Sequence, residues 1–144
     1  MFTGVHERQL DERGRVALPT TFRSHLGEFC YLTYGEDACV KVLSEAAFRK
    51  EAEALIDDVK AGSSTRARQR AFASSVVTVA PDKQGRIMLD QRLREYAGIG
   101  ANEPVVVVGV LDCIEVWNPD MFATEESVGR NELSGASPNE GARP

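Results

Sequence analysis

Two short segments of this 144-residue chain place an acid, a glycine and basic side chains at the same spacing: Asp11-Glu-Arg-Gly-Arg and Asp82-Lys-Gln-Gly-Arg. The acid followed by a glycine indicates a tight turn, because aspartate can bond its own backbone and glycine adopts a positive φ. An arginine on such a turn can bind a guanine edge or a phosphate. It can also pair with the aspartate of its own turn. The two interpretations are compatible, because the carboxylate can aim the arginine.

The two segments belong to a longer internal repeat. Residues 11–27 align with residues 82–98, with six identities in seventeen positions. Arg23 and Arg94 recur in this alignment, on short helices, where they are expected to pair with neighbouring acids. Further along, the two copies align again at a slightly larger sequence separation than that between residues 11 and 82. This alignment matches Gly35 with Gly109, Cys39 with Cys113 and Phe48 with Phe122. Two copies of one small unit therefore organise the chain.

Each copy is predicted to run strand, turn, strand, short helix, strand, turn and strand. The segments 15–18 and 86–89 alternate in polarity, so their apolar residues are expected to face inward: Val16, Leu18, Ile87 and Leu89. Buried strands are predicted over 29–33, 40–43, 105–109 and 114–117. The short helices are predicted to begin at Pro19 and Asp90 and to end at Gly27 and Gly98. Because such short strands cannot bury their faces alone, the copies should interlock into one β-barrel-like body.

A helical insert separates the copies. Ser44 can cap a helix whose apolar residues form one stripe: Phe48, Ala52, Leu55, Ile56 and Val59. A second helix is predicted over 65–73 and carries three arginines that do not share one face: Arg66, Arg68 and Arg70. A solvated surface is favoured over phosphate contact for them. After Asn118-Pro119-Asp120, another cap signature, little helix is expected, and an acidic, flexible tail is expected from about Glu125.

Charge and composition narrow the functional classes. Seventeen Lys and Arg against twenty-two Asp and Glu give a net charge of −5, which argues against bulk attraction to nucleic acid. With 42% hydrophobic residues the chain can form a packed core. The longest apolar run, 105–111, is far too short to span a bilayer, and the first residues lack a secretory signal. A soluble cytoplasmic protein is expected.

The remaining reactive residue types form no recognisable catalytic or metal-binding pattern. His6 and His25 could act as bases and Cys30 or Cys39 as a nucleophile, but no hydrolase elbow, P-loop, His-Glu-x-x-His or paired-carboxylate pattern is present. Together with Cys113, the two cysteines are expected to be buried free thiols. The sequence therefore predicts no catalytic residue, no metal, no cofactor and no small-molecule substrate.

The doubled Asp-x-x-Gly-Arg turn, the opening Met1-Phe2-x-Gly4 and the segment Leu18-Pro-x-x-Phe-Arg together resemble the MraZ family. The resemblance covers roughly residues 1–122. It implies an α+β fold in which two tandem swapped-hairpin, AbrB/SpoVT-like units form one pseudo-twofold barrel with a helical insert between them. The expected parts are a first unit over 1–48, the insert over 49–75, a second unit over 76–122 and the acidic tail over 123–144.

The same resemblance implies a bacterial transcriptional regulator, commonly a repressor. Such proteins bind direct repeats in double-stranded DNA upstream of the division and cell-wall gene cluster, as ring-shaped homo-oligomers, so a nucleoid-associated protein with no membrane partner is expected. The family's DNA-contacting loops correspond to Arg13, Arg15, Lys83 and Arg86, with Arg8 as a secondary contact. Two positions depart from the family pattern: Asp90 replaces a usual proline, and Gln84 replaces a Lys or Arg. The alternative hypothesis is a protein-interaction or assembly module that does not read DNA.

Overall fold

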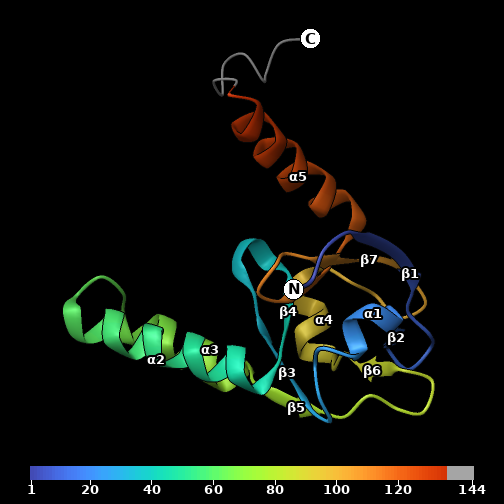
Figure 1. The fold of residues 1–144 in the computed structure, drawn as a ribbon, viewed down its shortest axis with the longest axis horizontal. Helices are drawn as coiled ribbons and strands as arrows, with labels where there is room; N and C mark the ends of the chain where they lie inside the picture. The colour runs from blue at the N-terminus through green and yellow to red at the C-terminus, as the bar shows by residue number, and fades with distance from the viewer. Residues whose placement is uncertain (136–144) are drawn as a thin grey trace.

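The computed structural model describes residues 1–135. The strands of this part of the chain are β1 (Val5–Gln9), β2 (Arg15–Ala17), β3 (Cys30–Tyr34), β4 (Val40–Leu43), β5 (Val77–Val79), β6 (Arg86–Met88), β7 (Pro104–Gly109) and β8 (Ile114–Trp117). The helices are α1 (Thr20–Arg23), the 3-10 turn η1 (Glu36–Ala38), α2 (Glu45–Ala61), α3 (Arg66–Ser75), α4 (Gln91–Ala97) and α5 (Pro119–Ser134). An α+β fold results, as predicted, with each copy of the repeat contributing four strands (Figure 1).

The two copies interlock through their strands. Six strands form one antiparallel sheet in the order β1-β7-β8-β4-β3-β5, so the first copy supplies β1, β4 and β3 and the second supplies β7, β8 and β5. The remaining strands, β2 and β6, pair with each other in a separate two-stranded ladder. The prediction that the copies pair with each other is therefore confirmed.

The prediction of one barrel is wrong, because the sheet does not close. Its edge strands β1 and β5 do not pair with each other within residues 1–135. Strands β2, β5 and β6 have three residues each. Strands β2 and β6 pair with each other and do not connect the two edge strands of the sheet. The swapped-hairpin arrangement stays an expectation from the family resemblance.

Two of the strand pairings between the copies, β2 with β6 and β4 with β8, are each centred on a pair of equivalent residues. In the β2–β6 ladder Val16 lies opposite Ile87, its equivalent in the repeat. In the sheet, Lys41 on β4 lies opposite its equivalent, Glu115 on β8. Equivalent residues face each other at both places, which is the arrangement that a local twofold relation between the copies produces.

The pairing register corrects one detail of the repeat alignment. Tyr34 pairs with Val40 in the first copy, whereas Gly109 pairs with Ile114 in the second, so the second hairpin loop is one residue shorter. Gly109 is therefore the counterpart of Tyr34 and not of Gly35. The extra residue of the first copy is accommodated in η1, where Asp37 and Ala38 both have positive φ, 61° and 62°.

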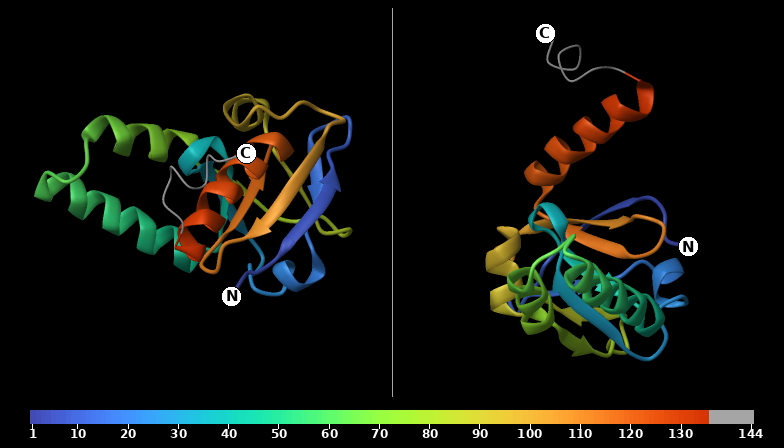
Figure 2. Two further views of the ribbon diagram at one scale, coloured as in Figure 1. Left: turned by 90° about the horizontal axis from the view of Figure 1, so that it is seen from above. Right: turned by 90° about the vertical axis from the view of Figure 1, so that its left-hand side faces the viewer.

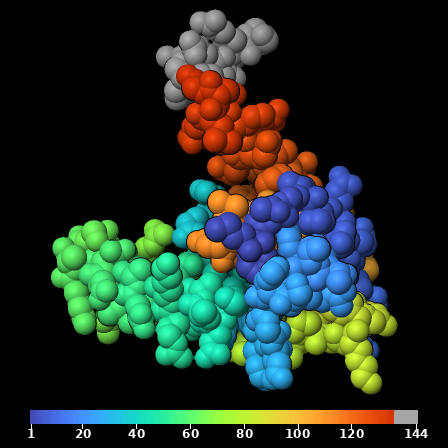
Figure 3. Space-filling view, viewed as in Figure 1, coloured from blue at the N-terminus to red at the C-terminus, as the bar shows by residue number. Residues whose placement is uncertain are grey.

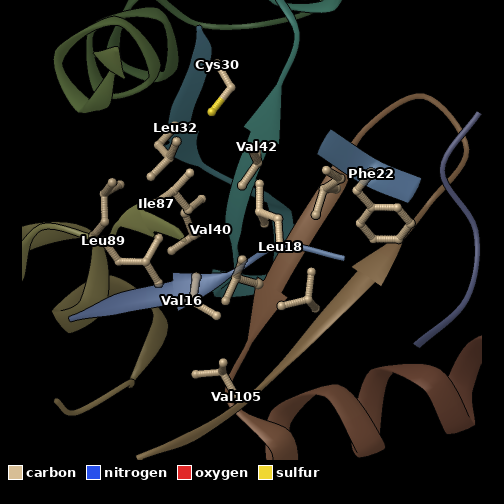
Figure 4. Packing of buried hydrophobic residues seen from close by; sticks show 14 of the residues in the cluster. Val16, Leu18, Phe22, Cys30, Leu32, Val40, Val42, Ile87, Leu89 and Val105 are labelled. Carbon is tan, nitrogen blue, oxygen red and sulfur yellow. The ribbon is translucent and has the colours of Figure 1, made fainter. Parts of the chain in front are cut away.

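Apolar residues of both copies fill the main core, and a second, smaller cluster forms around Cys39, Val106, Val108 and Trp117. The four residues predicted to face inward from β2, β6 and the segments after them are buried, and Figure 4 shows them converging with residues of β4: Val16, Leu18, Ile87, Leu89, Val40 and Val42. The short helices add Phe22 and Leu93. The predicted strand over 29–33 starts one residue later than expected, since Phe29 is 54% exposed and precedes β3.

The helix caps follow the sequence in most places. The side chains of Ser44 and Asp90 accept hydrogen bonds from the first turns of α2 and α4, and Gly98 ends α4 with a left-handed backbone, as predicted. Helix α1 differs, because Pro19 precedes it without a side-chain cap and the helix ends at Arg23. Gly27, with a φ of +79°, therefore lies beyond the end of α1 and does not cap it.

Helices α2 and α3 form a hairpin that extends to one side of the sheet (Figures 1 and 2). The predicted apolar stripe of α2 faces β3 and α3: the ring of Phe48 stacks on Tyr31 at 4.7 Å and on Phe72 at 5.9 Å. None of the residues of α2 is fully buried. The hairpin is thus attached to the body at its base.

The expectation of little helix after Asn118 is wrong. The Asn118 side chain accepts hydrogen bonds from the first turn of α5, and the ion pair of Arg130 with Glu126, 2.8 Å apart, supports the second half of the helix. Helix α5 packs on the body through Phe122, and beyond that point it stands clear of it (Figure 3). Residues 136–144 of the predicted flexible tail lie outside the described part of the chain, and the tail's flexibility stays a prediction.

Candidate nucleic-acid interface

The first turn is built around the carboxylate of Asp11. Its Oδ1 accepts the backbone N–H groups of Arg13 and Arg15, both at 2.9 Å. Gly14, with a φ of +81°, closes the turn by donating its N–H to the Asp11 carbonyl. The other carboxylate oxygen, Oδ2, accepts a charged hydrogen bond from Arg15 Nε at 2.6 Å. One aspartate therefore shapes the turn and orients its arginine.

The second turn repeats this geometry. Asp82 Oδ1 accepts the N–H groups of Gln84 and Arg86 at 2.9 Å, and Arg86 Nε donates to Asp82 Oδ2 at 2.9 Å. The ion pair that the sequence left as one of two interpretations is thus present in both copies. It does not occupy either guanidinium fully, since the Arg15 and Arg86 side chains keep 25% and 29% of their surface exposed.

Both aspartates are held in their charged form. The pKa of Asp11 is lowered to about 2. The largest cause is the hydrogen bond from the backbone N–H of Arg15, and the Arg15 side chain lowers the pKa further. The N–H and guanidinium of Arg86 lower the pKa of Asp82 in the same way. Because hydrogen bonds to a carboxylate favour its ionised form, both turns keep their ion pairs at neutral pH.

The tertiary structure brings the two turns side by side. Arg86 Nη1 lies 3.8 Å from Asp11 Oδ2, so its guanidinium faces the carboxylates of both turns. Two backbone hydrogen bonds join them reciprocally: Leu18 N–H donates to the Gly85 carbonyl, and Leu89 N–H donates to the Gly14 carbonyl. Both turns lie at the end of the body away from the α2–α3 hairpin (Figure 1). Residues predicted separately in each copy therefore form one surface.

The tips of the turns carry exposed charges. Arg13 and Lys83 are exposed, and neither forms an ion pair within residues 1–135. Glu12 is exposed beside Arg13 and reduces the positive charge of the first tip. The carboxylates of Asp11 and Asp82 are already neutralised by their own arginines, so the second tip is the more positive of the two.

Arg8 differs from the other predicted contacts. Its Nε donates to the Ala17 carbonyl at 3.2 Å and its Nη1 to the Glu7 carbonyl at 2.9 Å. Part of its guanidinium is therefore committed to the backbone of β1 and β2. Through Ala17, at the end of β2, Arg8 contacts the strand that follows the first turn.

The three arginines of α3 lie elsewhere. Helix α3 belongs to the hairpin on the side of the molecule away from the turns (Figure 1). Arg68 Nη2 is 3.8 Å from Glu36 Oε1, and Arg66 and Arg70 are exposed. The structure does not bring them together with the turns, and their contact with phosphate stays an open alternative.

Arg23 and Arg94 contact the turns, which the sequence analysis did not anticipate. Neither forms the expected ion pair with an acid within residues 1–135. Instead, Arg23 lies against Gly85 and Arg94 against Gly14. Their recurrence at the same place in both copies was the signal that could have pointed to a shared role.

The histidines contact aromatic rings, with His6 half-buried and His25 exposed, and the cysteines are buried. The ring of His6 contacts Phe22 edge-on at 5.1 Å, and that of His25 contacts Phe2 at 6.0 Å. All three cysteines are buried and free, as predicted, and burial raises the pKa of Cys30 to about 11, which disfavours a nucleophilic thiolate. Within residues 1–135 no three His, Cys, Asp or Glu side chains are grouped as a metal site would need. In the same range, none of the helices combines the length and apolar character that crossing a bilayer requires.

Comparison with known proteins agrees with the repeat. The sequence matches the family model of the MraZ protein, described as antitoxin-like, twice, over residues 1–75 and 72–138. It is similar to the Transcriptional regulator MraZ of Arthrobacter sp. (strain FB24), with 37% identity over 134 residues that cover 93% of this chain and 92% of that protein. Proteins of the same name from Bifidobacterium longum and Salinispora tropica are each 34% identical, over 93% and 100% of this chain and 90% and 99% of their own lengths.

Proposed function

Since the chain belongs to the MraZ family, whose members are named as transcriptional regulators, we propose that it regulates transcription by binding double-stranded DNA through its paired arginine turns. The observation that carries this proposal is the adjacency of two turns from separate copies, each with an aspartate-oriented arginine and an exposed basic tip. The contacts proposed are Arg13, Arg15, Lys83 and Arg86, with Arg8 as a secondary contact. Catalysis is no part of this role.

The two kinds of basic residue suit two kinds of contact. Arg15 and Arg86 are held in a defined direction by their carboxylates, which suits a paired hydrogen bond to a guanine edge. Arg13 and Lys83 are exposed on the tips, where they suit phosphate oxygens, which set position but carry no sequence information. Gly14 and Gly85, with φ of 81° and 76°, allow each turn to close so that its basic residues project together.

A single chain offers few positive side chains, and its net charge is −5. Affinity for DNA at physiological salt therefore requires several chains acting together. We propose a ring-shaped homo-oligomer that presents its turns to successive direct repeats, so that each contact raises the effective concentration of the next. The family resemblance supports repeats upstream of the division and cell-wall gene cluster as the site, and repression as the outcome.

The test is DNA binding by Arg15→Ala and Arg86→Ala. The probe is a fluorescent duplex from directly upstream of the gene, with its direct repeats either intact or scrambled, and light scattering gives the mass of the protein. A lost paired contact to a base costs about 1–3 kcal/mol, so each variant should bind the intact probe at least about tenfold more weakly through several subunits. Mass and fold should not change.

The matched control is Arg49→Ala. This change removes the same charge from an arginine of α2 whose side chain is 70% exposed and, among residues 1–135, forms an ion pair with Glu45 only. It should leave affinity for the probe unchanged. Undiminished binding by both turn variants would show that the turns are not the DNA contact.

The alternative, an assembly module that binds a protein partner without reading DNA, is distinguished by salt. Affinity through arginine and lysine contacts to phosphate falls steeply as salt rises. The logarithm of the binding constant falls linearly with the logarithm of the salt concentration, with a slope of about −0.9 for each phosphate contacted. Apolar association with a protein does not fall in this way. Failure of the wild-type chain to bind the intact probe at low salt would favour the alternative.

A further inference from the structure

The two glycine turns are each covered by an arginine from the other copy of the repeat. Arg94, on α4 of the second copy, lies against Gly14 of the first: a Cβ added at Gly14 would be 2.8 Å from Arg94 Nε. Arg23, at the end of α1 in the first copy, lies against Gly85 of the second so closely that a Cβ there would overlap its guanidinium. Both glycines are buried. Each copy thus supplies the arginine that covers the glycine of the other.

Each arginine is anchored in its own copy while it covers the other. Arg94 Nε donates to the Leu89 carbonyl at 3.0 Å, and the N–H of Leu89 donates to the Gly14 carbonyl at 2.9 Å. Arg23 Nη2 donates to Thr20 Oγ1 at 2.9 Å. Each short helix is thereby connected to the opposite turn through one side chain.

These contacts are not ordinary ion pairs. Within residues 1–135 neither arginine lies within ion-pair distance of a carboxylate, and the Nε of Arg23 is buried without a hydrogen-bond partner there. Burying such a group costs free energy. At the glycine itself each arginine side chain contributes by packing: it fills the space that the absent Cβ leaves and covers the backbone of the turn.

We propose that Arg23 and Arg94 are positioning residues that hold the turns of the opposite copy in their DNA-competent conformation. Arg23 holds the turn 82–86, and Arg94 holds the turn 11–15. This inference rests on the proposed function for its consequence, since an ordered turn binds DNA without first losing conformational freedom. The crossing also makes the two tips one rigid pair, so their spacing is set inside each chain.

Hydrogen–deuterium exchange of the full chain tests the crossing without DNA. The variants are Arg23→Met and Arg94→Met, which keep an unbranched stem but remove the guanidinium and its charge. Arg23→Met should speed exchange in peptides covering 82–86 by roughly tenfold and leave those covering 11–15 unchanged. Arg94→Met should do the reverse. Arg49→Met, which removes a charge from an exposed position on α2, should change neither.

Lysine variants separate packing from charge and remain informative if a methionine variant is unstable. Arg23→Lys and Arg94→Lys keep the charge but lack the flat guanidinium, so they should show the same crossed pattern. Faster exchange in the turn of the arginine's own copy, equal change in both turns, or no change in either would overturn the proposal.

DNA binding gives the second readout. Arg23→Lys, which retains the positive charge, should weaken binding to the intact-repeat probe about as much as Arg23→Met and keep the salt dependence of the wild type. Full affinity in Arg23→Lys with loss in Arg23→Met would overturn positioning in favour of a direct charge contact. If the wild type did not bind the probe, the proposed function would fail, while the exchange pattern would still decide whether the crossing holds the turns.

Discussion

At the scale of single residues, the two oxygens of one aspartate carry out different tasks. In both turns Oδ1 accepts two backbone N–H groups, which the Oδ1 of an asparagine could also do. Oδ2 accepts the arginine Nε, which asparagine could not do because its NH2 group is a donor. The structural ion pair and the proposed DNA contact are therefore not competing explanations of Arg15 and Arg86. The carboxylate fixes the direction in which the rest of the guanidinium points.

The low pKa of Asp11 gives a prediction in acid. Because its pKa is about 2 in the folded chain and about 3.9 in an unfolded one, its contribution to stability is fully present above about pH 3.9 and is lost as the pH falls through about 2. NMR titration of the Arg13 and Arg15 amide signals should therefore show a step near pH 2. Asp11→Asn should remove that step, and a step near pH 4 in the wild type would contradict the geometry of the turn.

At the scale of elements, Lys41 connects the hairpin to the sheet. It lies on β4, 6% exposed, and its Nζ is 2.7 Å from Glu36 Oε2 of η1 and 2.6 Å from Glu51 Oε1 of α2. Burial alone lowers the pKa of Lys41, but the two carboxylates outweigh it and raise the pKa above its ordinary value. The ion pairs are therefore intact at neutral pH, and their contribution is lost only as the pH rises past the pKa of the folded chain.

Lys41→Met should lower the free energy of unfolding by about 1–3 kcal/mol, because Glu36 and Glu51 lose their shared partner. Urea unfolding monitored by circular dichroism measures the change. Lys50→Met, at an exposed position of α2, is the matched control and should change stability by less than about 0.5 kcal/mol. Equal stability of the two variants would show that the buried network does not hold the hairpin.

At the scale of the whole molecule, two sequence copies make one folding unit. The sheet alternates strands of the two copies at three of its junctions, and the β2–β6 ladder joins them again. Neither copy can bury its apolar face without the other. The proposed units over 1–48 and 76–122 therefore share their main core, which contains residues of both copies.

Ile87→Ala tests this unity. Ile87 is 1% exposed and lies opposite Val16 of the other copy, so the change should lower the free energy of unfolding by about 2–5 kcal/mol. Fluorescence of the single tryptophan, Trp117, and far-ultraviolet circular dichroism should still report one coincident transition. Met88→Ala, at the neighbouring position that is 40% exposed, should have a much smaller effect. Two separate transitions would contradict a shared core.

The features that could be predicted from the sequence are those with a local cause. The strands over 40–43 and 114–117 have the predicted bounds because apolar residues follow a turn signal, and Ser44 caps α2 through its own side chain. The turns with Asp11 and Asp82 follow from aspartate and glycine chemistry within five residues. The helix α5 was missed because its exposed face is polar and glycine-containing, which resembles a flexible segment.

Spacing and residue type were sufficient to predict the doubled motif, the inward-facing residues and the chemistry available on each turn. Tertiary structure alone decided that the sheet stays open, that the two turns lie side by side, and that Arg23 covers Gly85 while Arg94 covers Gly14. Those outcomes depend on which strands from distant parts of the chain pair and in what register. No local preference encodes that choice, because it is settled by the burial of both copies in one core.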